Sequence, residues 1–368
     1  MYIDEISILN FKNLKDVQVS FSSRLNCFIG NNGAGKTNLM DAVYYLSFCK
    51  SFFNASDQIN IMHNEEFFII NGIYNRFNSK EAVSCALQKG QKKLFKRNSK
   101  IYNKLADHIG LLPLVMISPS DVNLLLGGSA ERRKFMDGVI SQYDPNYLDD
   151  LIHYNRAVFQ RNNLLRQFTS ENYFDQELLS VWDSRLIEHG NRIHLKRSRF
   201  VKDIIPVFQK YYSFISMENE RVGLAHQSDL YNSSFELLLN DNVNRDRALQ
   251  YTTTGIHKDE LLFNIDEYPI KKLGSQGQKK TYLVALKMAQ FNFIAEISGM
   301  KPILLLDDIF DKLDRNRVEQ IIKLVSGDQF GQIFITDTNR SHLDGILKEM
   351  ASDFRIFNVT SGSIQQIQ

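Results

Sequence analysis

The sequence predicts an α/β fold in which both ends of the chain build one core and a helical lobe is inserted between them. Three observations carry this prediction. A buried strand, a glycine-rich loop and a helical stripe follow one another near the N-terminus, the central part shows helical spacing, and strands alternate with helices again toward the C-terminus. We therefore expect three segments, 1–112, 113–255 and 256–368, and no long coiled coil, because no heptad pattern is sustained.

The first segment begins with a predicted β-hairpin. β-Branched and aromatic residues surround the polar pair Lys12–Asn13, where a turn is expected. Residues 25–29 form a short apolar run that predicts a buried strand, and apolar residues recur at helical spacing over 39–46. Further strands are expected over 67–102.

The second segment is predicted to be helical, and the third returns to strands and helices. The clearest helical stripe covers 201–215, and Pro206 inside it should start, kink or split a helix. In the third segment, strands are expected at 303–306, 333–336 and 355–359, and helical stripes at 318–325 and 343–350.

Composition and charge limit the classes of function. The chain has 368 residues and a net charge of +2, so any nucleic-acid binding needs a local basic patch or a groove formed by assembly. The three cysteines have no metal-type spacing, which favours reduced thiols. There is no apolar run of membrane-spanning length, and the acidic start is unlike a secretory signal. We expect a cytoplasmic protein with no membrane partner.

The glycine-rich loop predicts a nucleoside triphosphate site. Its sequence fits the phosphate-loop pattern G-x-x-x-x-G-K-[S/T] between a predicted strand and a predicted helix. Backbone N–H groups and the helix N-terminus would bind the phosphates, Lys36 would neutralise the β- and γ-phosphates, and the Thr37 hydroxyl would bind Mg²⁺. The alternative is a turn that only joins strand to helix. The predicted nucleotide-binding residues are Gly30, Asn31, Asn32, Gly33, Ala34, Gly35, Lys36 and Thr37.

A second part of this site follows the predicted strand at 303–306. Asp307 and Asp308 end an apolar run, where buried carboxylates are costly unless a cation or a proton meets them. We expect Asp307 beside the Mg²⁺, holding it mainly through water, and Asp308 as the catalytic group that orients or activates the attacking water. A solvated acidic turn is the alternative.

A third motif lies shortly before the acidic strand. Leu-Gly-Ser-Gln-Gly-Gln, which contains Ser275, Gln276, Gly277 and Gln278, resembles the L-S-G-G-Q signature of the ABC ATPase superfamily. In that superfamily two heads enclose two nucleotides, and the signature serine of each head reaches the γ-phosphate bound by the other. The alternative is an ordinary loop in which Ser275 caps a helix.

Further stretches narrow the resemblance to the RecF family. The N-terminal NFKN and GNNGAGKTNLMDAV resemble the SMC/RecF branch, and Arg132, Arg133, Phe135 and Asp137, with TTGIHKDEL from Thr253, resemble RecF itself. The resemblance implies an ABC-type ATPase head with an N-terminal β subdomain, which binds ATP and Mg²⁺ and dimerises with ATP. It also implies slow DNA-dependent hydrolysis, binding at single-strand gaps and single-/double-strand junctions, and RecR and RecO as partners.

Two features of transporter heads are missing. Asp337–Thr338 stand where those proteins carry a switch histidine, and no glutamine stands near Ser118. His342 comes later and fits a helix-surface residue better than that switch. The residues that sense the γ-phosphate therefore stay open.

Basic residues supply candidates for DNA contact, although most charge runs are solvated faces and Lys12 fits a solvated charge equally well. Phosphate contacts alone would give affinity with little sequence specificity. The candidates are Lys12 in the hairpin, Lys92, Lys93, Lys96 and Arg97 in one segment, and Arg192, Lys196 and Arg197 on a predicted helix.

Two other classes of protein share the nucleotide motifs. The motor subunit of a membrane transporter would carry the switch histidine and a smaller helical lobe. An SMC-like ATPase of a defence or toxin system would be marked by a fused nuclease domain, for which this chain has no room.

Overall fold

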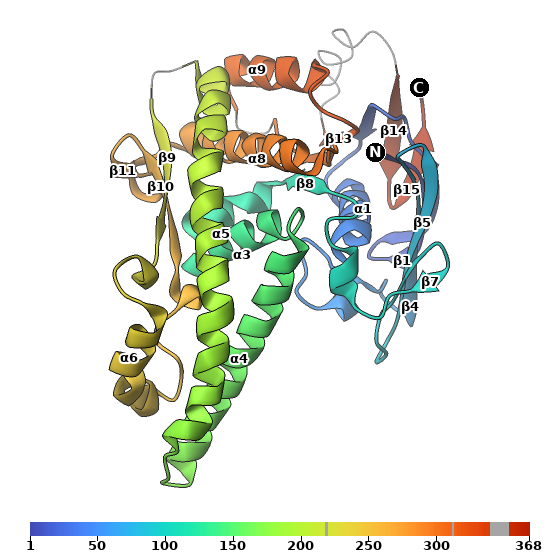
Figure 1. Cartoon of the computed structure of the whole chain (residues 1–368). Helices are drawn as coiled ribbons and strands as arrows, with labels where there is room; N and C mark the ends of the chain where they lie inside the picture. The colour runs from blue at the N-terminus through green and yellow to red at the C-terminus, as the bar shows by residue number, and fades with distance from the viewer. Residues whose placement is uncertain (218–219, 311–312, 339–352) are drawn as a thin grey trace. The chain divides into compact units, whose positions relative to one another are not determined.

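The computed structural model describes residues 1–217, 220–310, 313–338 and 353–368. The chain forms two compact units: Met1–Asp121, Tyr211–Glu218 and Ser275–Gln368 make the first, and Val122–Lys210 and Asn219–Gly274 make the second. Both chain ends lie in the β-rich part of the first unit (Figure 1). The boundaries differ from the expected 112/113 and 255/256.

The first unit contains a six-stranded antiparallel sheet in the order β2-β1-β4-β5-β6-β7. The predicted hairpin is present, with Lys12–Asn13 as the turn between β1 and β2. Apolar residues alternate along these strands, so one face packs on the core. The strands are β1 (Tyr2–Phe11), β2 (Leu14–Ser20), β4 (Phe67–Arg76), β5 (Ser79–Gln88), β6 (Leu94–Arg97) and β7 (Lys100–Ile101).

The second sheet of this unit has the order β15-β14-β3-β13-β12-β8 and is parallel except for β15. β8 lies beside β12, which explains why residues 114–117 join this unit instead of the helical lobe. The predicted strands are confirmed, whereas the expected stripe at 343–350 lies outside the described residues. The strands are β3 (Leu25–Ile29), β8 (Leu114–Ile117), β12 (Ile303–Asp307), β13 (Ile333–Asp337), β14 (Phe354–Thr360) and β15 (Ser363–Gln366).

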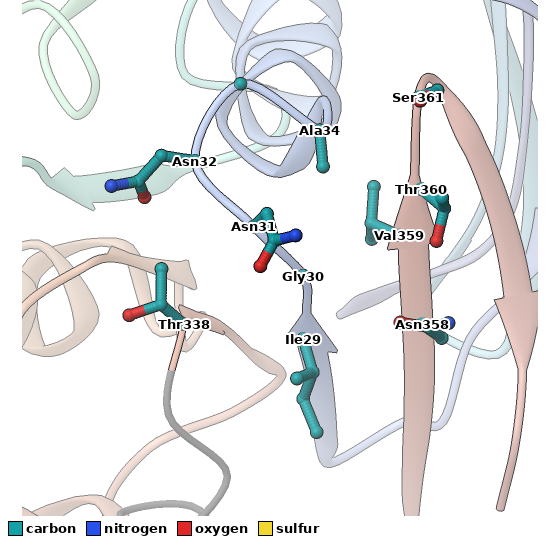
Figure 2. Close-up of a pocket in the computed structure, with 11 residues that line it drawn as sticks. Ile29, Gly30, Asn31, Asn32, Ala34, Thr338, Asn358, Val359, Thr360 and Ser361 are labelled. Carbon is teal, nitrogen blue, oxygen red and sulfur yellow. The ribbon is translucent and has the colours of Figure 1, made fainter.

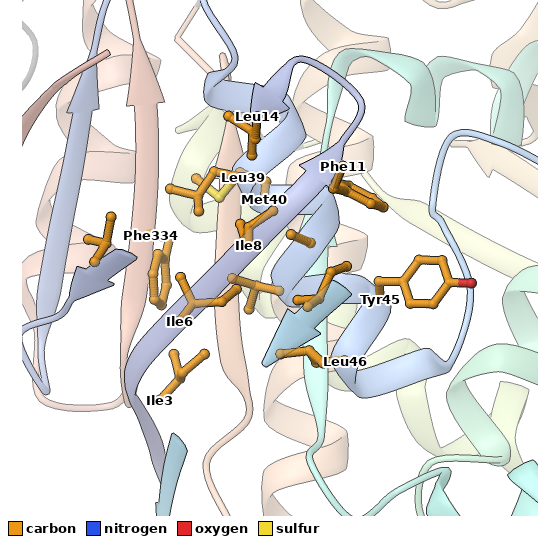
Figure 3. Packing of buried hydrophobic residues seen from close by; sticks show 14 of the residues in the cluster. Ile3, Ile6, Ile8, Phe11, Leu14, Leu39, Met40, Tyr45, Leu46 and Phe334 are labelled. Atoms are coloured by element: carbon orange, nitrogen blue, oxygen red, sulfur yellow. The ribbon is translucent and has the colours of Figure 1, made fainter. Parts of the chain in front are cut away.

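Helix α1 (Lys36–Phe48) joins the two sheets into one core. Its apolar residues pack against β1 and β4 of one sheet and against β12 and β13 of the other. Figure 3 shows Leu39 and Leu46 of α1 beside Ile6 of β1, in a cluster that also holds Phe334 of β13. Each such fully buried side chain stabilises the fold by about 1.5–3 kcal/mol. Two further helices of this unit are α8 (Gln276–Ser298) and α9 (Arg315–Ser326).

The second unit is mainly helical and also contains a three-stranded sheet. Helix α5 runs through Pro206, so the helix neither starts nor splits there. The sheet has the order β11-β10-β9, and local periodicity did not predict it, because β9 pairs with a strand over thirty residues away. The elements are α2 (Val122–Leu126), α3 (Ser129–Ile140), α4 (Pro145–Ser170), α5 (Gln176–Ser216, which belongs to the first unit from Tyr211 onward), β9 (Val222–Gln227), α6 (Phe235–Leu249), β10 (Glu260–Ile265), β11 (Tyr268–Pro269) and α7 (Ile270–Leu273).

Two arginines are buried inside the second unit, and carboxylates neutralise both. Arg161 is 0% exposed, and its guanidinium lies 2.5 Å from Asp183 and 2.5 Å from Asp246. Arg197 is 1% exposed and lies 2.8 Å from both Asp137 and Asp259. These ion pairs join residues that are far apart in the sequence.

None of the helices in the described ranges combines the length and the apolar character needed to cross a membrane.

Candidate nucleotide site

The phosphate loop connects β3 to α1 with a backbone that requires glycine at three positions. Gly33 and Gly35 have φ values of +78° and +119°, in the left-handed region that other residues rarely adopt. Gly30 is confined instead by space: a Cβ there would lie 2.3 Å from the carbonyl oxygen of Val359 in β14. The loop therefore follows the course that a phosphate cradle needs.

Neighbouring turns hold this loop from two directions. The amide of Asn13, in the β1–β2 turn, donates to the carbonyl of Gly33 at 3.3 Å and accepts from the amide of Asn38 at 2.7 Å. The N–H of Gly362, in the β14–β15 turn, donates to the carbonyl of Ala34 at 2.8 Å. Asn13 is not among the residues that the sequence predicts for the site. In the NFKN segment only its charged neighbour, Lys12, was predicted to have a function.

Lys36 places a buried cation at the loop. The residue is 4% exposed, and its Nζ donates to the carbonyls of Gly30 at 2.7 Å and Asn31 at 3.2 Å. Across the described ranges of the chain, no carboxylate forms an ion pair with it. A buried cation without a carboxylate favours binding of an anion, as the motif predicts.

Thr37 and Asp307, each predicted to bind Mg²⁺, lie side by side although they are far apart in the sequence. The Thr37 hydroxyl lies 3.0 Å from each carboxylate oxygen of Asp307. Burial raises the pKa of Asp307, and the hydrogen bond from Thr336 only partly opposes this. A hydroxyl and a desolvated carboxylate are oxygen donors of the kind that Mg²⁺ prefers.

These two side chains fit Mg²⁺ only together with a nucleotide. Within the described ranges, no group of three or more His, Cys, Asp or Glu residues could hold a metal ion. A cation at Thr37 and Asp307 would therefore take further ligands from phosphate oxygens and water, as Mg²⁺ usually does in nucleotide sites.

Asp308 follows directly and has an unusual backbone. Its φ is +45°, and its N–H donates to the hydroxyl of Thr336 at 3.0 Å. The same hydroxyl donates to Asp307 at 2.7 Å. Thr336 lies on β13, one residue before the Asp337–Thr338 pair, and the sheet register brings it beside Asp307.

A pocket of about 430 Å³ lies beside the loop (Figure 2). Lys36, Thr37 and Asp307 are not among its lining residues. It is lined by Ile29 to Ala34, by Thr338 after β13, and by Asn358 to Ser361 of the β14–β15 hairpin. Thr338 belongs to the pair that replaces the switch histidine, while His342 lies outside the described residues.

The signature segment begins α8. Ser275 is the N-cap: its hydroxyl accepts from the N–H of Gln278 at 3.1 Å, and its own N–H donates to the Gln278 side chain at 2.7 Å. The capping interpretation is therefore correct for one head. Ser275 and Gln276 are exposed, and the Gly277 position is crowded, since a Cβ there would lie 2.4 Å from the Arg317 guanidinium. The role of this segment in a second head stays a prediction.

Carboxylates engage most of the basic candidates in the first unit. The ammonium of Lys12 lies 2.6 Å from Asp41 and is 12% exposed. Lys93 and Arg97 pair with Asp57 and Glu81 at 2.7 and 2.6 Å. By contrast, Lys92 is exposed and Lys96 partly exposed, and neither forms an ion pair with any other described residue.

The candidates on α5 need a correction. Arg197 is 1% exposed and pairs with the buried Asp259 and the partly buried Asp137, so it has no surface to offer DNA and is not a DNA contact. Lys196 pairs with Asp144 at 2.8 Å. Arg192 pairs with Asp150 and Glu188 but keeps 54% of its side chain exposed.

Comparisons with known proteins cover the whole chain. Residues 2–365 match the model of the RecF/RecN/SMC N terminal domain. The DNA replication and repair protein RecF of Bacteroides fragilis (strain YCH46) is 53% identical over 100% of this chain and 99% of its own length. That of Flavobacterium johnsoniae is 47% identical over 98% of this chain and 100% of its own length.

Solved structures agree with this assignment. The recombination mediator protein RecF-ATP in the RecFOR pathway has a TM-score of 0.90 at 28% identity, covering 100% of this chain and 98% of that one. An SMC head bound to the C-winged helix domain of ScpA has a TM-score of 0.59 at 14% identity, with 100% and 98% covered, and shares the fold alone. The chain therefore belongs to the RecF family and has the fold of an ABC-type ATPase head with an inserted helical lobe.

Proposed function

We propose that this protein is an ATP-dependent, DNA-binding recombination mediator of the RecF type. It acts at single-strand gaps and single-/double-strand junctions in DNA replication and repair, and slow, DNA-dependent ATP hydrolysis controls its dimerisation on DNA. One observation carries the nucleotide part: a buried lysine without a carboxylate stands in the phosphate loop, and the next residue, Thr37, contacts the buried Asp307 at 3.0 Å. The relatives named RecF support the role in repair.

Each residue of the nucleotide site has a separate role in ATP hydrolysis. Backbone N–H groups of the loop and the charge of Lys36 bind the phosphates and stabilise the charge that develops on them. Thr37 and Asp307 hold Mg²⁺, which neutralises phosphate charge when it is bound. Asp308 orients the attacking water, and slow turnover is what the family resemblance implies.

The signature segment completes this site in a homodimer. Ser275 and Gln276 are exposed at the N-terminus of a 23-residue helix, where N–H groups and the helix dipole favour an anion. In an ATP-dependent dimer, Ser275 to Gln278 of one protomer contact the γ-phosphate bound by the other. A single head would then bind ATP but hydrolyse it poorly.

DNA binding rests on the basic residues that the fold leaves available. Lys92 and Lys96, together with the exposed part of Arg192, can contact phosphates and would give affinity without sequence reading. RecR and RecO are proposed as partners because the chain belongs to the RecF family.

The decisive experiment replaces Ser275 with arginine. Ser275→Arg should fold, bind ATP as a monomer, and fail to dimerise, hydrolyse ATP or stay on gapped DNA with ATP. Ser234→Arg is the matched control: Ser234 is also an exposed N-cap serine, on α6, and its hydroxyl accepts from Leu237 N at 3.3 Å. Loss of either cap should cost about 1 kcal/mol of stability, so only a role in trans separates the two variants.

Mixing variants tests the composite site directly. A mixture of Ser275→Arg with Lys36→Ala contains one site with an intact loop and an intact signature, and should recover part of the ATPase activity. ATP-dependent dimers of Ser275→Arg, seen by light scattering at the wild-type level, would reject the arrangement.

A further inference from the structure

Thr336 occupies a position between the two acidic residues of the site. β13 and β12 are neighbouring parallel strands, and their register places Thr336 directly beside Asp307. The threonine is 0% exposed, so water does not compete for its hydroxyl. A buried hydroxyl in this position must find its partners within the protein.

The directions of its two hydrogen bonds follow from the chemistry of the partners. The backbone N–H of Asp308 can only donate, so the Thr336 oxygen is the acceptor of that 3.0 Å bond. The single hydroxyl proton is then available for the carboxylate of Asp307 at 2.7 Å. One oxygen atom thus links the side chain of one acidic residue to the backbone of the next.

Both links matter for geometry. The carboxylate of Asp307 accepts from Thr336 on one oxygen and faces the Thr37 hydroxyl with both, which limits its rotation. Asp308 has a φ of +45°, a backbone conformation that is uncommon outside glycine, although Asp adopts it more readily than most residues. Its hydrogen bond to Thr336 supports this conformation at the residue where the chain leaves β12.

We propose that Thr336 is the positioning residue of this site: its hydroxyl orients Asp307 toward the Mg²⁺ and fixes the backbone from which Asp308 reaches the attacking water. This inference rests on the proposed nucleotide function and assigns a part in it to Thr336, which directly precedes the switch-histidine position at Asp337–Thr338 and was not predicted as a site residue. Thr336 itself touches neither nucleotide nor metal. Partners of this kind around a metal ligand typically change metal affinity or activity by about 10- to 100-fold when they are removed.

The test uses Thr336→Val, which keeps the shape of the side chain and removes the donor and the acceptor together. The Mg²⁺ concentration for half-maximal ATP hydrolysis should rise about tenfold or more, and kcat should fall. Thr336→Ser restores the hydroxyl and should recover most of both. Binding of a fluorescent ATP analogue in EDTA should stay at the wild-type level, because the phosphate loop is unchanged.

Thr281→Val is the matched control. Thr281 is also 0% exposed in the same unit, but its hydroxyl has no hydrogen-bond partner among the residues that the structure describes. The same chemical change there should leave the Mg²⁺ dependence unaltered. A shift equal to that of Thr336→Val would trace the effect to general packing and overturn the proposal.

Two further outcomes would also overturn it. Thr336→Val could hydrolyse ATP with the wild-type Mg²⁺ dependence, or it could lose nucleotide binding in EDTA, which would make the hydroxyl a support of the loop. Failure of the proposed function looks different, because the wild type itself would then show no Mg²⁺-dependent ATP hydrolysis.

Discussion

Asp307 in the first unit and Asp259 in the second are each 2% exposed, but their surroundings differ. Burial disfavours the charge of Asp259, yet the hydrogen bond from His226 and the charge of Arg197 outweigh it, so the pKa of Asp259 is lowered. At Asp307 burial outweighs the hydroxyl bonds, and the pKa is raised. The fold places a cation at ion-pair distance from Asp259, whereas the described hydrogen-bond donors to Asp307 are neutral hydroxyls, and the charge of Lys36 lowers the pKa of Asp307 less than burial raises it.

The buried cations show the same difference. Arg161 of the second unit lies between two carboxylates at 2.5 Å, whereas Lys36 of the first unit contacts only backbone carbonyls among the hydrogen-bond partners described for it. In the second unit, buried ion pairs join distant segments of the chain. In the first unit, Lys36 has no ion-pair partner among the described residues and the charge of Asp307 is opposed mainly by burial, so we expect a nucleotide and its metal ion to complete these two charges.

We expect the largest loss of stability when the arginine of a buried ion-pair network is removed. Arg161→Met leaves Asp183 and Asp246 buried without their cation and should lower the free energy of unfolding by about 3–5 kcal/mol, measured by urea denaturation. Arg199→Met removes an arginine that is 85% exposed, with its Asp203 partner 3.4 Å away, and should cost less than about 1 kcal/mol. Equal losses in the two variants would show that the buried network contributes no more than a surface pair.

The same substitution at the two aspartates should have opposite signs. Asp259→Asn removes a charge that Arg197 needs and should destabilise the protein by about 3 kcal/mol. Asp307→Asn removes a charge that burial disfavours and should stabilise the ligand-free protein by about 1 kcal/mol while abolishing Mg²⁺-dependent hydrolysis. Thermal unfolding without nucleotide measures both, and destabilisation by Asp307→Asn would contradict the comparison.

Lys36→Ala tests whether the buried ammonium group of Lys36 binds the phosphates of ATP. Loss of its charge-assisted hydrogen bonds to phosphate should weaken ATP binding about 10- to 100-fold, measured by titration calorimetry. Lys93→Ala is the control, because Lys93 is also partly buried but already pairs with Asp57 at 2.7 Å. ATP affinity should be unchanged there, and near-normal affinity in Lys36→Ala would reject the phosphate-loop assignment.

His108 gives the smallest effect and a third way of burying a titratable group. It is 0% exposed, its Nε2 lies 2.7 Å from the carbonyl of Leu46, and burial lowers its pKa to about 4. The unfolded chain takes up a proton near pH 6.5 and the folded one near 4, so stability is lost as pH falls through this window. From pH 7 to 5.5 the loss should be about 1 kcal/mol.

His108→Gln isolates this contribution, because the glutamine amide can still donate to Leu46 but does not titrate. Urea denaturation at several pH values should show a smaller decrease for this variant over the same range. An unchanged pH dependence would assign the loss to other groups.

The sequence could predict those parts of the fold and the site that depend on residues adjacent in the chain. The phosphate loop and the pair Asp307–Asp308 are local motifs, and the structure places Thr37 against Asp307 as expected. Thr336 could not be found, because its role depends on the register of two strands. The three-stranded sheet of the second unit likewise depends on pairing between distant segments.

The prediction that Arg197 contacts DNA was wrong, although the spacing of apolar residues around it indicated that it is buried. It stood in a run of basic residues, and the run was treated as a candidate DNA surface. Its helical neighbours Ile193, Phe200 and Ile204, at positions i−4, i+3 and i+7, are all buried, which places Arg197 on the same buried face. Periodicity around a charged residue was thus more informative than the number of charges nearby.

The order of translation determines when the phosphate loop can become structured. β3 pairs with β13 on one side and β14 on the other, and the turn after β14 bonds to Ala34 of the loop. Both neighbours are made about 300 residues after the loop, a delay of roughly 15–65 s at synthesis rates of about 5–20 residues per second. During translation the loop therefore lacks the strands and the turn that hold it in the folded protein, and the nucleotide site is completed only after β14 and the turn that follows it have been made.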